Sequence, residues 1–337
     1  MKFLLRLLAV GILAAVAAFA WISWRLTQPY SSFSAPVYLD FARGTSTQDM
    51  ADALAKNGVI QSPWLFLAAR GLRRGSTLQA GEYRFDHPAS PLEVFGRISR
   101  GDIYYMELLV PEGYNMFDIA EAVGKLGTIR PAAFLSAAKD PSMILDLDPA
   151  APSLEGYLFP NKYRVLRRTT ARQLCRMMTD EFRLQWRQVN SDSPVHHNVH
   201  DAVTLASLVE REAKRPEERP LVASVFANRL RIGMKLDCDP TTVYAALLEN
   251  RYRGTIYRSD LRSSSEWNTY RHAGLPPGPI ANPGLSSIRA ALEPANSDYL
   301  YFVAKADGSG GHNFSDSLAQ HETNVVHYER AAGHSHR

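Results

Sequence analysis

The chain begins with an unbroken apolar segment. Residues 7–24 carry no charge, whereas Lys2 and Arg6 precede them and Arg25 comes directly after them. About 18 apolar residues are close to the minimum for one membrane-spanning helix, so the pattern predicts a transmembrane anchor over residues 1–26 with a short cytoplasmic start. The N-terminal basic residues favour export of the remainder of the chain, although Arg25 weakens the charge asymmetry.

A removed signal peptide is the alternative, because Ala18-Phe19-Ala20 fits a small-x-small cleavage site. We favour the anchor because apolar character continues through Trp21, Ile22 and Trp24, and tryptophan is typical of the membrane interface. Either interpretation exports the body of the chain. The anchor makes it a single-pass protein of the inner (cytoplasmic) membrane, with its body on the periplasmic (extracytoplasmic) side.

Beyond the anchor, short strand patterns alternate with amphipathic helix patterns. Residues 27–35 are polar and contain serine and proline, which predicts a linker. A small α+β module is expected over residues 36–105, with strands at Val37–Phe41 and Gly81–Phe85. Its three helices are expected over residues 47–57, 63–74 and 91–100.

The rest of the chain continues as a mixed α+β pattern. A connecting α+β region is expected over residues 106–152, with a strand near 104–110 and helices near 116–126 and 131–138. Three prolines between Asp140 and Pro152 indicate its boundary. A mixed α+β domain is expected over residues 153–330, with helices near 170–189, 203–213 and 222–230, followed by a disordered tail over residues 331–337.

Composition narrows the class of protein. With 337 residues, 45% hydrophobic and 21% charged, the chain is typical of a globular protein with two folded units. A net charge of +4, with no basic block interleaved with aromatics, argues against nucleic acid as a partner. We expect Cys175 and Cys238 to be unpaired. We expect no metal site at His196, His197 and His200, because no matching set of ligands lies nearby.

Glu212 is the most informative residue in the pattern. Read as a helix, the segment VTLASLVEREA places Leu205, Leu208 and Val209 in one apolar stripe with Glu212 in its middle, while Glu210 projects from roughly the opposite side. An acid on an apolar face is desolvated, which raises its pKa toward the value that a general acid needs near neutral pH. The alternative is a glutamate at a helix end that bends out to water.

Six segments after residue 200 resemble, in order and spacing, the endolytic murein transglycosylases of the YceG-like (MltG) family: LASLVERE, VASVFANRLRIGMKL, CDPTTVYA, NTYRHAGLPPGPIANPG, YLYFVA and GHNF. The resemblance covers most of residues 154–328 and extends more weakly to the anchor and the GEYRF region. It implies that the catalytic acid is the second glutamate of the E-x-E pair, Glu212. It also implies a LysM-like, glycan-binding role for residues 36–105.

The resemblance further implies non-hydrolytic cleavage of nascent peptidoglycan between MurNAc and GlcNAc, without a cofactor. One carboxyl group suffices, since Glu212 protonates the departing glycosidic oxygen and then removes the proton from the MurNAc C6 hydroxyl, which closes a 1,6-anhydro ring on C1. Glycoside hydrolases need a second carboxylate. The nearest candidate is Asp239, which is better explained as a cap of the helix after it.

Several side chains after Glu212 can hydrogen-bond sugar hydroxyl or N-acetyl groups. The substrate-binding candidates are Asn228, Arg229, Asp239, Thr241, Asn268, Thr269, Tyr270, His312 and Phe314. Arg229 can bind a lactyl or peptide carboxylate, or pair structurally with Glu210 or Glu217.

The expected partners are peptidoglycan glycan strands, the membrane and, as further candidates, peptidoglycan synthases. A non-catalytic peptidoglycan-binding scaffold of the elongation or division machinery is the alternative to an enzyme. A pyridoxal-phosphate lyase would need a cytoplasmic body and a cofactor lysine, and the export signal argues against it.

Overall fold

A computed structural model describes residues 2–73, 75–192 and 198–334. The described chain is mixed α+β, as predicted: helices dominate, and the strands form three separate two-stranded sheets. The chain divides into two compact units, Met1–Met106 and Glu107–Arg337.

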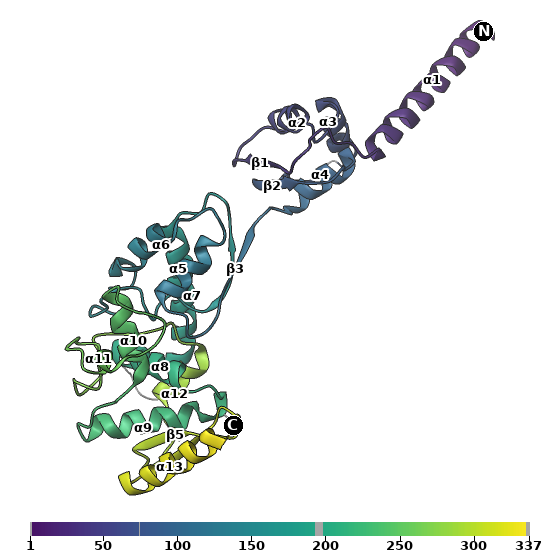
Figure 1. Cartoon of the computed structure of the whole chain (residues 1–337). Helices are drawn as coiled ribbons and strands as arrows, with labels where there is room; N and C mark the ends of the chain where they lie inside the picture. The colour runs from purple at the N-terminus through teal and green to yellow at the C-terminus, as the bar shows by residue number, and fades with distance from the viewer. Residues whose placement is uncertain (1, 74, 193–197, 335–337) are drawn as a thin grey trace. The chain divides into compact units, whose positions relative to one another are not determined.

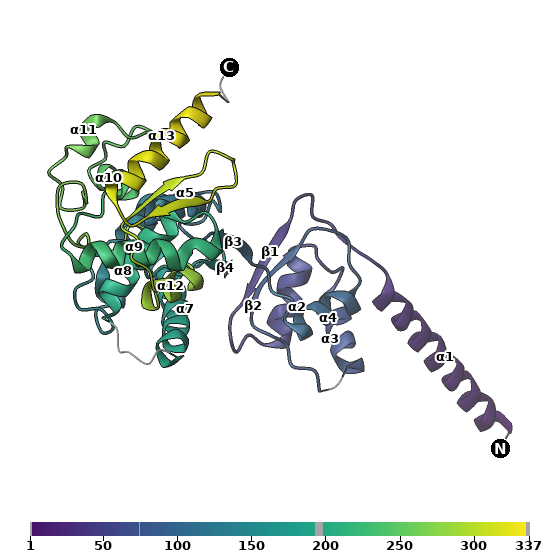
Figure 2. The same ribbon diagram turned by 90° about the horizontal axis from the view of Figure 1, so that it is seen from below.

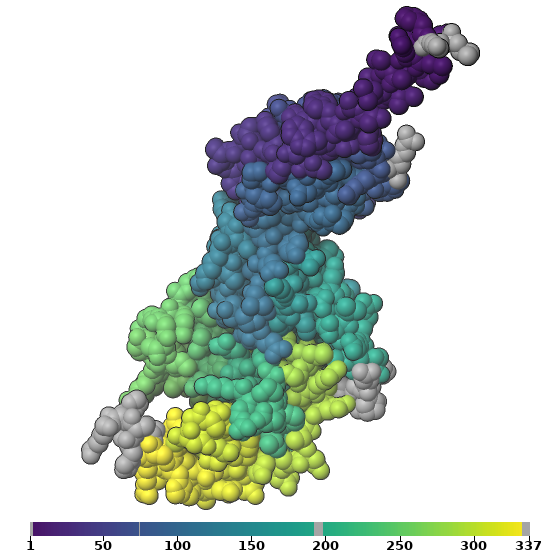
Figure 3. Space-filling view, turned by 90° about the vertical axis from the view of Figure 1, so that its right-hand side faces the viewer, coloured from purple at the N-terminus to yellow at the C-terminus, as the bar shows by residue number. Residues whose placement is uncertain are grey.

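The first unit begins with one long helix, α1 (Lys2–Thr27). Its segment Phe3–Thr27 has a mean hydropathy of 2.4 and is long and apolar enough to cross a membrane, a property that a membrane anchor and a signal sequence share. The last turns of α1 belong to the small module after it, because Leu26 is fully buried in the module core and Trp21 stacks on Trp64. Figure 3 shows the earlier turns projecting away from this module.

The module after α1 consists of β1 (Val37–Phe41), α2 (Thr47–Lys56), α3 (Pro63–Leu72), β2 (Gly81–Phe85) and α4 (Pro91–Arg100). The two strands are antiparallel, with Val37 opposite Phe85 and Phe41 opposite Gly81. Alternation along β2 places Gly81, Tyr83 and Phe85 in the core, where side chains of α2, α3 and α4 cover them.

The ends of α4 follow from local chemistry. Ser90 and Glu93 form a reciprocal capping box, and Pro91 begins the helix with its backbone angle already suitable. Gly101 ends it in the left-handed conformation at φ 71°, which costs a glycine little. The boundaries predicted for this helix are confirmed.

The segment predicted as a linker is attached to the module. The backbone of Tyr30 pairs with Ala89 in an antiparallel bridge, at 3.1 Å from Tyr30 N to Ala89 O. The Ser32 amide donates to the Gly58 carbonyl at 2.9 Å. The segment predicted as a linker therefore pairs with the module through its main chain, which its polar composition does not prevent.

The second unit is mainly helical. A short sheet pairs β3 (Met106–Val110) with β4 (Asn161–Val165), and an antiparallel hairpin joins β5 (Tyr301–Ala304) to β6 (His312–Ser315). Its α-helices are α5 (Met116–Gly124), α6 (Pro131–Ala138), α7 (Ala171–Asp192), α8 (Val199–Glu212), α9 (Arg219–Arg231), α10 (Asp239–Leu248), α11 (Arg258–Leu261), α12 (Leu285–Leu292) and α13 (Leu318–His334). The single 3₁₀ turns are η1 (Pro141–Met143) and η2 (Pro216–Glu218).

Helix α8 lies at the centre of this unit (Figures 1 and 2) and packs against α9, α10 and α12. Asn198 caps its first turn by accepting a hydrogen bond from the His200 amide at 2.9 Å. In mid-helix, the Ser207 hydroxyl accepts a hydrogen bond from the Ile280 amide at 3.1 Å, which fixes the Pro/Gly-rich loop against α8. Helix α8 is thus held on several sides, and its C-terminal end has a defined position.

Three smaller predictions have definite outcomes. Both cysteines are buried and unpaired, as expected. The predicted tail is partly helical, because α13 continues through His334, and residues 335–337 lie outside the described residues. His196 and His197 also lie outside them, while His200 Nδ1 lies 2.8 Å from Asp148 Oδ2.

Candidate active site

Glu212 is the last residue of α8, and its carboxyl group faces a cavity. Burial is the main cause that raises the pKa of Glu212, and the negative charge of Asp239 adds to it. A hydrogen bond from Cys238 and the positive charges of His312 and Arg211 act in the opposite direction. The carboxyl group therefore holds its proton to a higher pH than an exposed glutamate does.

The cavity beside Glu212 has a volume of about 430 Å³, within the range usual for small-ligand sites. Aromatic and aliphatic groups form part of its wall: Phe226, Leu236, Tyr301, Phe302 and Leu318. The remainder is polar, formed with Glu212 by Arg229, Asp237, Cys238, Asp239, Tyr270 and His321. A mixed wall of this kind fits a ligand such as a sugar, which has both apolar faces and hydroxyl groups.

Cys238 makes the direct contact with Glu212. Its thiol donates to Glu212 Oε1 at 3.2 Å, and burial beside this carboxyl raises the thiol pKa well above its usual value, so it stays a donor. The Cys238 backbone is fixed by two predicted site residues: Thr269 Oγ1 accepts from the Cys238 amide at 3.0 Å, and the Thr241 hydroxyl donates to the Cys238 carbonyl at 2.6 Å. Both threonines are buried, and they position Cys238 rather than line the cavity.

Asp239 and Tyr270 lie together at the cavity wall. The Tyr270 hydroxyl donates to Asp239 Oδ1 at 2.8 Å. The predicted capping role of Asp239 is corrected, because Cys238 is the N-cap of α10 and Asp239 is the first helical residue. Its charge still suits the positive end of the helix dipole.

Arg229 connects several backbone segments and also lines the cavity. Its Nε donates to the Leu300 carbonyl at 2.6 Å, and its Nη1 donates to the Leu236 carbonyl at 2.9 Å. Its ion-pair partner is Asp237, at 3.6 Å, rather than Glu210 or Glu217. The guanidinium also lies over the Tyr301 ring, 5.3 Å from its centroid. Arg229 thus stabilises the cavity wall while remaining next to its interior.

His312 and Phe314 come from β6. His312 Nδ1 lies 2.8 Å from Glu218 Oε2, and its backbone amide donates to the other oxygen of Glu218 at 3.1 Å. Phe314 packs in an aromatic group with Tyr299 and Phe302. Neither residue lines the cavity itself, but the charge of His312 reaches Glu212.

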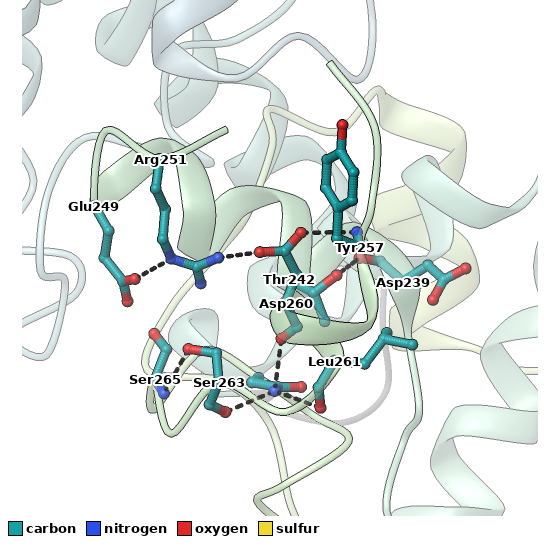
Figure 4. A network of polar contacts seen from close by, with 10 residues as sticks. Asp239, Thr242, Glu249, Arg251, Tyr257, Asp260, Leu261, Ser263 and Ser265 are labelled. Atoms are coloured by element: carbon teal, nitrogen blue, oxygen red, sulfur yellow. Dashed lines mark hydrogen bonds and ion pairs between the residues drawn. The ribbon is translucent and has the colours of Figure 1, made fainter. Parts of the chain in front are cut away.

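Two predicted asparagines form structural contacts. Asn228 Nδ2 donates to the carbonyls of Ser297 and Tyr299 at 2.8 and 3.0 Å. Asn268 is fully buried, and its amide donates to the carbonyls of Asp260, Leu261 and Ser263. Figure 4 shows these carbonyls around one nitrogen, beside the ion pairs that join Glu249, Arg251 and Asp260. The network fixes the loop that precedes Thr269 and Tyr270.

Glu210 has an environment opposite to the predicted one. Its side chain is only 5% exposed, and Oε1 accepts from Arg219 Nη2 at 2.9 Å. Oε2 accepts from the Gly284 amide at 2.9 Å, where a β-carbon on Gly284 would collide with the carboxylate of Glu112. The expectation that Glu210 faces outward is therefore wrong: the face opposite the apolar stripe is covered by α9 and the loop before α12.

Among the cavity residues that the prediction missed, four carry polar groups: Asp237, Cys238, Tyr301 and His321. Cys238 and Tyr301 lie inside motifs already noted, CDPT and YLYFV, so their positions were accessible to sequence reasoning. Asp237 adopts φ 48°, which is rare for a residue other than glycine, and nothing in the sequence signals it. Among the described residues, no group of three or more His, Cys, Asp or Glu side chains could hold a metal ion.

Comparison with known proteins gives consistent matches. A model of the YceG-like family matches residues 39–327. The chain is 32% identical over 308 residues to the endolytic murein transglycosylase of Bacillus subtilis (strain 168), an alignment that covers 85% of this chain and 82% of that protein.

Two further similarities extend this result. A protein of the same name from Streptococcus pneumoniae (strain ATCC BAA-255 / R6) is 28% identical over 324 residues, which are 87% of this chain but 58% of the streptococcal protein. The crystal structure of a YceG-like protein from Listeria monocytogenes superposes with a TM-score of 0.56 at 29% identity, covering 86% of this chain and 99% of that one.

Proposed function

Since the chain belongs to the YceG-like family, we propose that it is an endolytic murein transglycosylase, which cleaves peptidoglycan strands between MurNAc and GlcNAc and leaves 1,6-anhydro-MurNAc ends. The observation that carries this proposal is the desolvated carboxyl of Glu212 at the wall of a cavity. The names of the bacterial relatives supply the substrate class.

In the proposed mechanism, Glu212 first acts as a general acid. Its raised pKa keeps the proton available for the departing glycosidic oxygen. The resulting carboxylate then accepts the proton of the MurNAc C6 hydroxyl, whose oxygen bonds to C1. Glu212 thereby regains a proton, and no water is consumed.

The other cavity groups have supporting roles in this mechanism. The Cys238 thiol stabilises the carboxylate after the first proton transfer, because it donates to Oε1. Tyr270, Asp239 and Arg229 offer hydrogen bonds to the sugar. The aromatic wall suits an apolar sugar face, and no second catalytic carboxylate is required.

We also propose that α1 anchors the protein in the inner membrane, with both folded units on the outer side. Its length and apolar surface support this, together with Trp21 and Trp24 near its end. For the first unit we propose LysM-like glycan binding. A cavity of about 720 Å³ supports this, since polar groups line it: the loop after β1 and the segment before β2 form most of its wall, and Thr47 of α2 and Arg70 of α3 complete it with Met50.

The test uses the full-length protein in detergent with uncrosslinked glycan strands. We expect products with 1,6-anhydro ends and internal cleavage, and no such products from Glu212→Gln. If the wild-type protein binds the strands but forms no anhydro ends, the enzyme proposal is wrong and a binding scaffold is the better assignment. Fractionation of cells tests the anchor, which predicts an uncleaved protein in the membrane fraction.

A further inference from the structure

Helix α3 exposes an apolar stripe on the surface of the first unit. Trp64, Ala68 and Leu72 are four residues apart and therefore lie along one side of the helix. Trp64 is 39% exposed and Leu72 is 54% exposed. A different side of the same helix fills the module core with Leu65, Phe66 and Ala69. The helix thus has more apolar surface than its own module covers.

The start of this stripe contacts the end of α1. The rings of Trp21 and Trp64 stack with centroids 5.9 Å apart, and the Arg25 guanidinium lies over Trp21 at 5.8 Å. Arg25 also hydrogen-bonds Gln61, just before α3. Leu26, directly after Arg25, is fully buried in the module core. The end of α1 is therefore held against the module by Leu26 as well as by the contacts of Trp21 and Arg25. Figure 2 shows α1 leaving the module beside α3 and α4.

The contact fixes the depth of Trp64, at the start of α3, relative to a membrane that α1 spans. Tryptophans at the end of a spanning helix lie at the membrane–water interface, and Trp21 and Trp24 are more than half exposed on α1. Because Trp64 stacks on Trp21, it lies at a similar depth. The exposed Arg73 comes directly after Leu72, at the other end of the stripe. Apolar side chains beside arginines are typical of helices that lie in the interface.

We propose that α3 lies in the outer interface of the same membrane that α1 spans, with Trp64 and Leu72 inserted below the headgroups. Arg73 binds a lipid phosphate, for which the guanidinium fork is well suited. The occupant of the stripe is a phospholipid bilayer with anionic headgroups, because the helix that contacts the stripe is itself the most apolar segment of the chain. This inference rests on the proposed anchor.

The test places a polarity-sensitive fluorophore on single introduced cysteines in the full-length protein, reconstituted in vesicles of phosphatidylcholine and phosphatidylglycerol. The variants are Leu72→Cys on the stripe and Asp52→Cys, which is exposed on α2, as the matched control. The native cysteines are buried, and wild-type protein reports their background labelling. We expect a blue-shifted emission and quenching by nitroxide lipids at position 72, and neither at position 52. Equal behaviour at both positions overturns the proposal.

A third label separates this inference from the anchor. Val10 is exposed in the middle of α1, and Val10→Cys should be quenched by a nitroxide deep in the acyl chains. Quenching at position 10 without quenching at position 72 overturns the α3 surface and leaves the anchor intact. A label in water at position 10 overturns the anchor, and the inference with it.

The proposed lipid contact of Arg73 has its own readout. In vesicles of phosphatidylcholine alone, or with Arg73→Ser, quenching at position 72 should decrease. If neither change affects the quenching, the assignment of Arg73 to a lipid phosphate is wrong.

Discussion

The pKa values of two glutamates in the second unit, Glu212 and Glu155, are raised, and the surroundings of the two carboxyl groups differ in one respect that separates chemistry from structure. Glu212 faces a cavity and receives one weak hydrogen bond, from the Cys238 thiol. Glu155 is fully enclosed: its oxygens accept from the Met116 amide at 2.8 Å and from Asn282 Nδ2 at 2.7 Å. Burial raises the pKa of Glu155 to about 8 although these donors oppose it. A raised pKa therefore identifies a catalytic acid only together with access to a ligand.

The largest expected effect is the loss of cleavage in Glu212→Gln. Glutamine keeps the size of the side chain but cannot donate and recover a proton, so the rate of forming anhydro ends should fall by about 10³-fold or more. The unfolding free energy should change by less than about 1 kcal/mol, because no ion pair is broken. Product analysis and urea denaturation measure the two quantities.

Glu155→Gln is the matched control for that variant, since it alters an enclosed carboxyl whose pKa is also raised. It should retain cleavage at pH 6. If Glu155→Gln is inactive while folded and Glu212→Gln is active, the assignment of the acid is wrong.

The next effect is on stability, at Glu210. Glu210→Gln leaves the nearly buried Arg219 without its strongest partner, which should lower the unfolding free energy by about 3 kcal/mol. Glu112→Gln removes the second ion-pair partner of Arg219. The Glu112 side chain is 48% exposed, so this change should lower the unfolding free energy by less than about 1 kcal/mol. Urea denaturation at pH 7 compares them. Equal losses would contradict the larger contribution to stability that is expected of the buried Glu210–Arg219 pair.

Glu155 makes stability depend on pH. Its folded-state pKa of about 8 lies above its usual value of 4.5, so its contribution is complete below pH 4.5 and is lost as the pH rises toward 8. In Glu155→Gln this loss is absent. The wild-type protein should therefore lose a few kcal/mol more than Glu155→Gln between about pH 5 and 8, in denaturation curves recorded across that range. Parallel curves would contradict the enclosed, protonated carboxyl.

The smallest effects are opposite shifts in the pH profile of cleavage. Activity requires protonated Glu212, so it falls as the pH rises through the pKa of this residue. Cys238→Ala removes a hydrogen bond that lowers this pKa and should move the fall to higher pH, whereas Asp239→Asn removes a charge that raises it and should move the fall to lower pH. Each shift should be less than about one pH unit.

Cys238→Ser keeps a donor and should resemble the wild-type profile. Shifts in the same direction for Cys238→Ala and Asp239→Asn would contradict the electrostatic description of the cavity.

The sequence was informative where structure depends on neighbours along the chain. The caps at Ser90 and Gly101 define α4, and the helical stripe of α8 predicted that Glu212 is desolvated. The prediction from the sequence failed at Glu210, because Arg219 and Gly284 cover the side of α8 that was expected to meet water. Helical periodicity reports which side of a helix is apolar, but not which remote segments cover the other.

The same limit applies to the predicted substrate-binding residues. Asn228 and Asn268 have the donors that a sugar needs, but main-chain carbonyls of the surrounding loops use them. Residue type predicts hydrogen-bonding capacity, whereas the partner depends on the fold. Thr241 and Thr269 do not line the cavity but fix Cys238, which does. This role depends on a contact between two residues 28 positions apart in the sequence, which residue type alone does not predict.

The burial of Leu26 has a practical consequence for producing a soluble form of this protein. Cutting the gene after the apparent end of the apolar segment, at residue 27 or 28, would remove a core side chain that is fully buried in the first unit. A cut before Trp21 keeps Leu26 and the Trp21–Trp64 stack and removes most of the exposed apolar surface of α1. The best starting residue for crystallisation therefore lies inside the helix, not after it.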